Sequence, residues 1–585
     1  MALTNHIVPD SPTNNFCTWN KLAGRNKNSS NPFLQPTFSE GNTKVVAHSS
    51  EVTHAIGTIA STGKHYAEFI VSGGTSTITG VGVISSEWDK SNLQSYIYNF
   101  EGALYAAVGT LYSNTTTDTS PIAITTSFRV GIEVDFGANE VAFFKVESNG
   151  TRTQQGSTIT TNIDFKGSGS FAASLHNSND YIEAYFIEDD WWGTPNSGYT
   201  ALCTANLPDF TPTVTGDTPQ DYFKTVIWSG TTYANATVPV GFTPDFVWAK
   251  STNTSGNHRL VDSVRGGNGS LMYELASNDT GGNGTDSAIT GLSNNGINLS
   301  SGNFGAVSGQ DVVAWCFRAG GPPDLTSSPT KPFAKNGVQY ETLSAANITA
   351  GTITPTAMSV NTDAGFSIIK WVGNNTNNAT IPHGLTKEPD FVIIKNLTDT
   401  TIWIVKLNPN TNPAVSNEQQ YLYLNLPNDF GTNTGEETQL TSNTIKFVGP
   451  SLNNTNGSND NMIAYCWHSV EGYSKFGSYT GNGTTDGPFV YCGFRPAWIM
   501  IKQSSSSGNS WWITDSTRYE FNGDTPDALR ANTADQENTS NSAIMPDYLS
   551  NGFKIRGSDT AVNQNNSTYI YMAFAEQPFK FSNAR

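Results

Sequence analysis

The sequence is poor in charged side chains, which make up 14% of its 585 residues against roughly 25% in ordinary soluble domains. The formal net charge is −18, and no cluster of Lys and Arg offsets it. Because phosphate binding relies on such clusters, the composition argues against nucleic acid and anionic membranes as direct partners. No window approaches 18 consecutive apolar residues, and the start MALTNHIVPDSPTNNF lacks a charged region followed by an apolar one. We therefore expect no membrane insertion and no secretory signal.

Motifs of catalysis and metal binding are also missing. The five cysteines are odd in number and form no CxxC, which argues against a disulfide scaffold or a zinc site. GxSxG and HExxH are absent, and the eight histidines show no paired spacing. Turns such as NGSNDN from Asn456 and NGDTPD from Asn522 offer oxygen ligands, so the sequence allows a bound Ca²⁺ without assigning it. We expect no other cofactor and no catalysis.

Asn, Thr, Ser and Gly fill nearly every gap between apolar runs. Asn, Ser and Gly favour tight turns, Thr favours strands, and all four are poor helix formers. The sequence therefore predicts an all-β chain of tandem antiparallel β-sandwiches with few helices.

One short sequence motif, here called the phrase, occurs three times with variations. Its copies are GFTPDFVWAK from Gly241, GLTKEPDFVIIK from Gly384 and GFRPAWIMIK from Gly493. An aromatic-x-Gly strand end precedes each phrase, with its glycine 11, 11 and 12 residues upstream. Each unit closes on a similar strand, VVAWCF, MIAYCW or YIYMAF, 67, 72 and 72 residues after the lysine of the phrase. Ordered landmarks at near-constant spacing predict three related modules.

A module of about 100 residues can bury its own core, so we expect separate modules along the chain instead of a continuous stack. The predicted division is an N-terminal arm at 1–30, a β-sandwich at 31–210, repeats at 221–320, 363–470 and 471–585, and a linker at 321–362.

Both faces of the repeated strand are apolar, because Phe246 and Trp248 alternate with Val247 and Ala249. We expect the strand to be covered on both faces, either by a second sheet or by a neighbouring subunit. The lysines that end the phrase, Lys250, Lys395 and Lys502, are expected to pack their stems and keep their ammonium groups in water.

Residues 45 to 190 differ from the repeats. The order GKHYAEFIV, TGVGVIS, RVGIEVDFGANEVAFFKVESNG and SFAASL resembles the SPRY domain. This resemblance implies a concanavalin-like β-sandwich that presents loops for binding and has no catalysis of its own. The usual middle loops are replaced by segments rich in Asn and Thr, which leaves a loop ligand undefined.

The join GYTALCTANLPDFTP, the following DYFKTVIWSG and the final YIYMAFAEQPF resemble virion proteins of marine and cyanobacterial tailed phages. The resemblance implies a non-enzymatic structural protein of the virion, such as a tail fibre that contacts host-surface glycans. Such appendages usually assemble as homotrimers, and the strands that are apolar on both faces agree with that. We expect residues 1–30 to anchor the chain to other virion proteins. The alternatives are a capsid decoration or head fibre and a polysaccharide-degrading tailspike.

Two clusters are candidate sites. Glu188, Asp189 and Asp190 could supply the paired carboxylates of a glycosidase, although adjacent acids beside a turn are more often simply solvated. In NSWWITD, Trp511 and Trp512 point to opposite faces of an extended segment, so Trp512 is the candidate platform for a sugar ring. The competing interpretation is that Trp512 packs under a loop or against another subunit.

Overall fold

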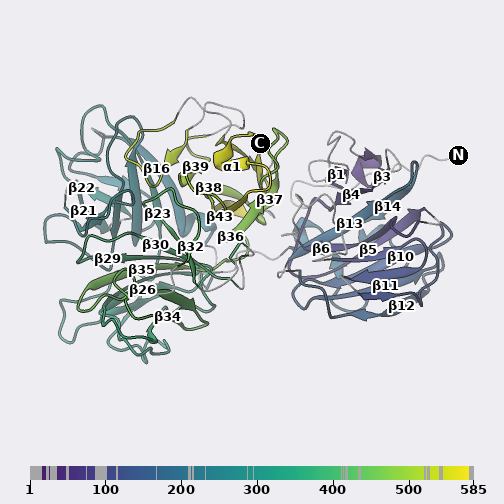
Figure 1. Ribbon diagram of the computed structural model, residues 1–585, viewed down its shortest axis with the longest axis horizontal. Coiled ribbons are helices and arrows are strands. Elements are labelled where there is room, and N and C mark those ends of the chain that lie inside the picture. The colour runs from purple at the N-terminus through teal and green to yellow at the C-terminus, as the bar shows by residue number, and fades with distance from the viewer. Residues whose placement is uncertain are drawn as a thin grey trace. The chain divides into compact units, whose positions relative to one another are not determined.

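The computed structural model of the chain divides into two compact units, the first mainly Met1–Asp209 and the second mainly Phe210–Gly487 with Phe494–Pro578 (Figure 1). In the described part of the chain, helix is confined to α1 (Thr560–Asn563) and to 3-10 turns. Among the same residues, no helix has the length and hydrophobicity needed to cross a membrane. The all-β prediction is confirmed. The structure describes residues 16–20, 25–26, 36–47, 52–73, 76–85, 102–113, 116–165, 168–207, 212–213, 217–230, 232–285, 288–293, 295–409, 412, 414–415, 419–432, 436–519, 522, 527–538 and 544–578.

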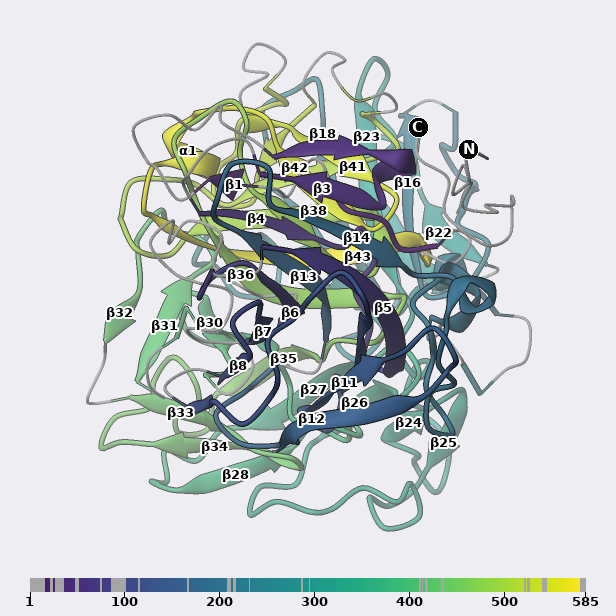
Figure 2. The same ribbon diagram turned by 90° about the vertical axis from the view of Figure 1, so that its right-hand side faces the viewer.

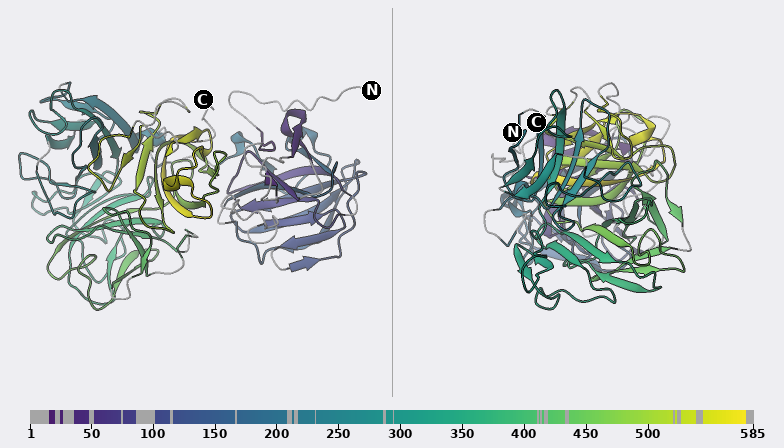
Figure 3. Two further views of the ribbon diagram at one scale, coloured as in Figure 1. Left: turned by 45° about the horizontal axis from the view of Figure 1, so that its top comes forward. Right: turned by 90° about the vertical axis from the view of Figure 1, so that its left-hand side faces the viewer.

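The first unit is a sandwich of two antiparallel sheets, as the SPRY resemblance implied (Figure 3). One sheet has the order β1 (Arg25–Asn26), β4 (Thr53–Ile56), β13 (Gly169–Leu175), β6 (Gly80–Ser85), β7 (Gly102–Ala106), β8 (Thr110–Ser113) and β9 (Thr116–Asp118). The other has the order β12 (Arg152–Ile159), β11 (Glu140–Val146), β10 (Arg129–Asp135), β5 (Lys64–Ser72), β14 (Tyr181–Tyr185), β3 (Lys44–Val46) and β2 (Thr37–Ser39), with β15 (Thr200–Ala201) parallel to β5.

The core of this sandwich includes residues that were expected to belong to the N-terminal arm. Trp19 is fully buried, donates from Nε1 to the carbonyl of Thr43 at 2.9 Å, and packs against Phe69 and Phe186. Residues 16–20 therefore belong to the sandwich. The rest of the predicted anchor, apart from residues 25–26, lies outside the described residues.

The second unit holds three modules with the same strand order in their larger sheets, and Figure 1 labels several of these strands. The first module has β16 (Phe223–Ser229), β23 (Asp311–Phe317), β18 (Phe246–Ser251), β19 (Arg259–Asp262) and β20 (Glu274–Leu275). The second has β27 (Phe366–Val372), β35 (Asn461–Trp467), β29 (Phe391–Asn396), β30 (Ile404–Leu407) and β31 (Gln420–Tyr423). The third has β36 (Ser474–Thr480), β43 (Thr568–Pro578), β38 (Phe494–Gln503), β39 (Trp512–Asp515) and β40 (Leu529–Arg530).

Each module adds a three-stranded sheet of matching order; that of the second module can be followed in Figure 2. These sheets are β17 (Thr237–Pro239), β22 (Gly296–Leu299) and β21 (Ile289–Ser293); β28 (Ala379–Pro382), β34 (Thr444–Val448) and β33 (Glu437–Leu440); and β37 (Phe489–Tyr491), β42 (Gly552–Ile555) and β41 (Pro546–Leu549). The three repeated segments are therefore copies of one antiparallel module.

The glycine of each aromatic-x-Gly landmark is required by a close backbone approach. A Cβ at Gly230, Gly373 or Gly481 would lie 2.1, 2.1 or 2.3 Å from a carbonyl oxygen of the loop that precedes the last strand of its module. Real Cβ atoms do not approach so closely, so a side chain at these positions would push that loop away. The repeated glycines are explained by packing.

The modules are not separate along the chain, because they share a hydrophobic core. The prediction of separate modules is therefore wrong. On the repeated strand of the first module, Val247 and Ala249 face the core of their own module, whereas Phe246 and Trp248 enter a core that all three modules share. This shared core contains Phe223, Phe246, Trp248, Trp315, Phe317, Phe366, Phe391, Ile393, Trp403, Tyr465, Trp467, Trp498, Met500, Trp511, Met572 and Phe574 among others. The second apolar face is thus covered by the other modules of the same chain and not by a neighbouring subunit.

Hydrogen bonds at equivalent positions join the modules in a cycle. Nε1 of Trp403 in the second module donates to the carbonyl of Ala276 in the first at 3.1 Å, and Nε1 of Trp511 in the third donates to Tyr423 in the second at 2.8 Å. His258 occupies the same position in the first module, with Nε2 lying 3.0 Å from the carbonyl of Arg530 in the third. Every module is therefore bonded to both of the others.

Residues 321–362 are not a linker. They contain β24 (Phe333–Lys335), β25 (Val338–Tyr340) and β26 (Ala357–Asn361), and β26 pairs with β27 over five residues. With β32 (Gly431–Thr432) at the far edge, the larger sheet of the second module reaches nine strands. The sequence prediction missed these strands because they are short and lie between Gly and Asn turns.

Candidate functional site

An open groove of about 720 Å³ lies among the described residues of the second unit. Its wall combines the end of the first module with the strands inserted before the second module. The lining residues are Thr213, Asp221, Tyr222, Gly241, Phe242, Thr243, Asp245, Asn295, Arg318, Ala319, Gly320, Gly321, Pro322, Asn336, Gly337, Asn361 and Asp363. Ligand pockets in proteins measure roughly 300–1,000 Å³, so this groove is large enough for a ligand.

Tight turns with left-handed backbone shape the groove. Gly241, Gly321 and Gly337 have φ of 104°, 95° and 82°, and Asn295 and Asn336 have φ of 60° and 49°. Only glycine adopts such angles freely, and asparagine is the side chain that tolerates them best. The abundance of Gly and Asn in the sequence thus gives the groove a wall of backbone and amide groups.

The floor is held by the carboxylate of Asp245. It accepts hydrogen bonds from the amides of Ala319 at 2.8 Å and Gly321 at 3.1 Å and from the hydroxyl of Ser263 at 2.7 Å. Burial raises the pKa of Asp245 to about 6, although these donors oppose the rise. Asp245 therefore fixes the turn after β23 and so positions Arg318.

The rim carries charged groups of both signs. Nη1 of Arg318 lies 3.5 Å from Oδ2 of Asp217, and the guanidinium lies over the ring of Tyr222 at 5.4 Å. Oδ2 of Asp221 accepts from the amide of Thr218 at 2.7 Å, and Oδ2 of Asp363 accepts from Thr213 at 2.9 Å. The arrangement offers cation and carboxylate groups to a polar ligand.

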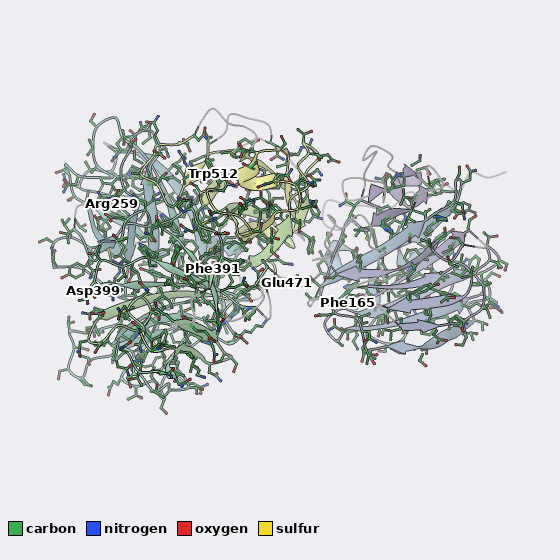
Figure 4. All side chains as sticks on the ribbon, in the orientation of Figure 1. Phe165, Arg259, Phe391, Asp399, Glu471 and Trp512 are labelled. Atoms are coloured by element: carbon green, nitrogen blue, oxygen red, sulfur yellow. The ribbon has the colours of Figure 1, made fainter. Side chains whose placement is uncertain are left out.

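Trp512, the sequence candidate for a sugar platform, is labelled in Figure 4 and is not among the residues that line the groove. Its side chain is 8% exposed, and the guanidinium of Arg530 lies over its ring at 5.3 Å. Trp511 is on the opposite face, as predicted, and lies in the shared core. The face of the Trp512 ring is therefore covered, in agreement with the competing interpretation that it packs.

The prediction that the three repeated lysines keep their ammonium groups in solvent is wrong, because all three side chains are fully buried. Nζ of Lys250, Lys395 and Lys502 donates to the carbonyl of the next residue at 2.9, 2.6 and 2.6 Å. Burial lowers the pKa of each lysine to about 8, with acids of another module opposing the shift. The ammonium groups hold the turns that end the repeated strands, and they do not converge on the groove.

We expect stability to rise with pH between about 8 and 9. The folded lysines have pKa values of about 8 and the unfolded ones 10.5, so in this window the unfolded chain binds more protons and folding is favoured as pH increases. Above pH 9 the buried thiols, whose pKa values are raised by burial, reverse the trend. Thermal unfolding at pH 7.5, 8.0, 8.5 and 9.0 tests this, and a variant with all three lysines replaced by Met should lose the rise.

The structure also places the other sequence candidates. Glu188, Asp189 and Asp190 form a 3-10 turn, and Oε1 of Glu188 accepts from the amide of Ala201. All five cysteines are buried, and none of them forms a disulfide. In the described ranges no group of three His, Cys, Asp or Glu residues is arranged to hold a metal ion.

The structure describes only one of the two turns considered for calcium in full. In NGSNDN, Oδ1 of Asn456 accepts from Trp371 and Oδ2 of Asp460 accepts from Asn396. Most of NGDTPD lies outside the described residues.

A second repeated motif went unnoticed in the sequence. Asp262-Ser-Val-Arg265 and Asp515-Ser-Thr-Arg518 begin at the last residue of β19 and of β39, the strands that come after the repeated strands of the first and third modules. In each motif the arginine is buried against its aspartate. The spacing Asp-Ser-x-Arg was the signal that could have revealed it. The groove had no such signal, because its residues come from segments far apart in the chain.

Comparisons with known proteins cover both units. The model of the family described as "Domain of unknown function (DUF7483)" matches residues 218–331 and 337–578, which span the three modules. No curated protein matches the sequence. Among solved structures, the SPRY domain of human HERC1 is 14% identical and covers 26% of this chain and 93% of its own, with a TM-score of 0.22. The TRIM65 PSpry domain is 10% identical, covering 29% and 92%, with a TM-score of 0.22. Stonustoxin is 20% identical, covering 29% and 27%, with a TM-score of 0.23.

Proposed function

We propose that this chain, which belongs to the DUF7483 family, a domain of unknown function, is a non-enzymatic structural protein of a tailed-phage virion. It forms part of a tail fibre or similar appendage and contributes to attachment to glycans on the host surface. The resemblance of the join GYTALCTANLPDFTP and of the chain end to phage virion proteins supports the location.

The observation that carries the proposal is that the residues common to the three modules serve packing. The repeated aromatic residues Phe246, Phe391 and Trp498 lie in the shared core, and the lysines at the ends of the same strands are buried. An enzyme built from repeats would be expected to keep acids or nucleophiles at equivalent open positions. Here the residues common to the three modules form a framework that leaves loops and turns as its variable surface, as in other binding scaffolds.

A homotrimer is not part of this proposal. Its structural support was the second apolar face of the repeated strands, and that face is covered by modules of the same chain. The three modules already provide, within one polypeptide, the three-part core that a trimer would otherwise build.

The test is competition for the host surface. The purified full chain, added to host cells before the phage, is expected to slow phage adsorption in proportion to its occupancy of the cells, whereas the same chain unfolded by heat should not. Gold-labelled antibodies against the chain should mark the tail in electron micrographs. Label on the head, or adsorption unchanged at saturating protein, would contradict the proposal. Release of oligosaccharides from host polysaccharide would indicate a depolymerase instead.

A further inference from the structure

We propose that the groove beside Arg318 binds an uncharged, polyhydroxylated ligand, namely a short stretch of a neutral oligosaccharide. This inference rests on the proposed attachment function and names the site and the ligand class that the attachment uses.

The first argument is the hydrogen-bonding capacity left on the rim. Asp221 and Asp363 each use Oδ2 in bonds to a neighbouring threonine. Within the described part of the chain, Oδ1 of both carboxylates has no bonding partner, and the exposed amide of Asn295 has none either. These groups face the same hollow, so they are available to a ligand.

The second argument is chemical complementarity. Carboxylate oxygens only accept hydrogen bonds, a guanidinium only donates them, and an amide side chain does both. A ligand that satisfies Asp221, Asp363 and Arg318 together must present donors and acceptors side by side. Sugar hydroxyl groups meet this requirement, because each is a donor and an acceptor at once.

The third argument is charge. The single guanidinium of Arg318 is already paired with Asp217, and two further carboxylates line the rim, in a chain of net charge −18. An anionic sugar placed here would meet more negative than positive charge. Uronic acids, sialic acids and phosphorylated sugars are therefore disfavoured, whereas a neutral oligosaccharide meets no such repulsion.

The experiment measures binding of the intact chain to a panel of immobilised oligosaccharides in neutral, carboxylated and amino-sugar classes. Neutral members are expected to bind, and the best is then titrated by calorimetry. Asn295→Gly removes the amide but keeps a residue that adopts φ of 60°. Arg318→Met keeps the length of the stem and removes the donors. Each variant should weaken binding by about 10-fold, the effect of one lost hydrogen bond to a polar or charged group.

Matched controls carry the same changes outside the groove. Asn347 is exposed with φ of 52°, and Arg556 is a half-exposed arginine paired with Asp547. Asn347→Gly and Arg556→Met should bind like the unchanged chain. If the groove variants also bind like the unchanged chain, the groove assignment is overturned while attachment stands. Preference for carboxylated or amino sugars overturns the ligand class, and no binding to any class contradicts both this inference and the proposed attachment.

Discussion

Replacing Asp262 with Asn is expected to destabilise the second unit by about 3–5 kcal/mol, the usual cost of removing one partner of a buried ion pair. Oδ2 of Asp262 lies 2.5 Å from Nε of Arg265, and both side chains are fully buried. The same oxygen accepts from the hydroxyl of Tyr465, in the second module, at 2.8 Å. The change therefore leaves a buried guanidinium without its counter-charge and weakens a contact between modules. Urea-induced unfolding of the full chain, followed by tryptophan fluorescence, measures the loss.

The chain itself supplies the controls for this prediction. Glu341 is exposed, so Glu341→Gln removes the same charge at little cost. At the equivalent positions of the second and third modules, Leu407 replaces the aspartate and Met572 replaces the donor, and both lie in the shared core. In the sequence Asn410 stands three residues after Leu407, just as Arg265 stands three residues after Asp262. A triple variant, Asp262→Leu with Arg265→Asn and Tyr465→Met, therefore copies the residue types of the other two modules and should lose less stability than Asp262→Asn alone. An equal or larger loss in the triple variant would show that the ion pair is not what the single change disrupts.

Acid is expected to weaken the junction between the first and third modules through His258. Nδ1 of His258 lies 2.9 Å from Nε1 of Trp248, which can only donate, so Nδ1 accepts and Nε2 carries the proton that is donated to the carbonyl of Arg530. Burial lowers the pKa of His258 to about 3, and the nearby Lys250 adds to the effect. The charged groups around this junction are Lys250, Arg530, Asp535 and Glu537.

The sign of the pH dependence follows from linkage. In the unfolded chain His258 takes up its proton at about pH 6.5, and in the folded chain only near pH 3. The contribution of neutral His258 to the free energy of unfolding is therefore fully present above pH 6.5 and is lost as the pH falls. Between pH 6.5 and 5 this one residue accounts for about 2 kcal/mol. His258→Gln can make both hydrogen bonds without titrating. Its free energy of unfolding should therefore fall by about 2 kcal/mol less than that of the unchanged chain between pH 7 and pH 5, measured by urea unfolding at both values. Parallel losses would contradict the prediction.

The candidate site shows where sequence analysis stopped. Trp512 drew attention because of its residue type, yet Arg530 covers its ring. The groove is assembled from Asn295, Arg318 and Asp363, which are unremarkable in the sequence and meet only because β24, β25 and β26 join the sheet of the second module. Short strands between Gly and Asn turns carry little periodicity, so neither these strands nor the groove could be predicted.

The sandwich of the first unit followed from the resemblance to the SPRY domain. By itself the sequence determined the all-β class, the three copies of one module and the alternation of the two apolar faces on each repeated strand. These features depend on local preferences of Asn, Gly and Thr and on residue spacing, which are written along the chain. Only the tertiary structure decided what covers the second apolar face and why the ammonium groups of Lys250, Lys395 and Lys502 are buried. It also explains why His258, Trp403 and Trp511 occupy equivalent positions, since each makes a hydrogen bond to a neighbouring module. Burial of an apolar strand face is favourable whichever apolar surface covers it. The pattern therefore predicts that the second face is covered, but it does not say whether another sheet, another module or another chain covers it.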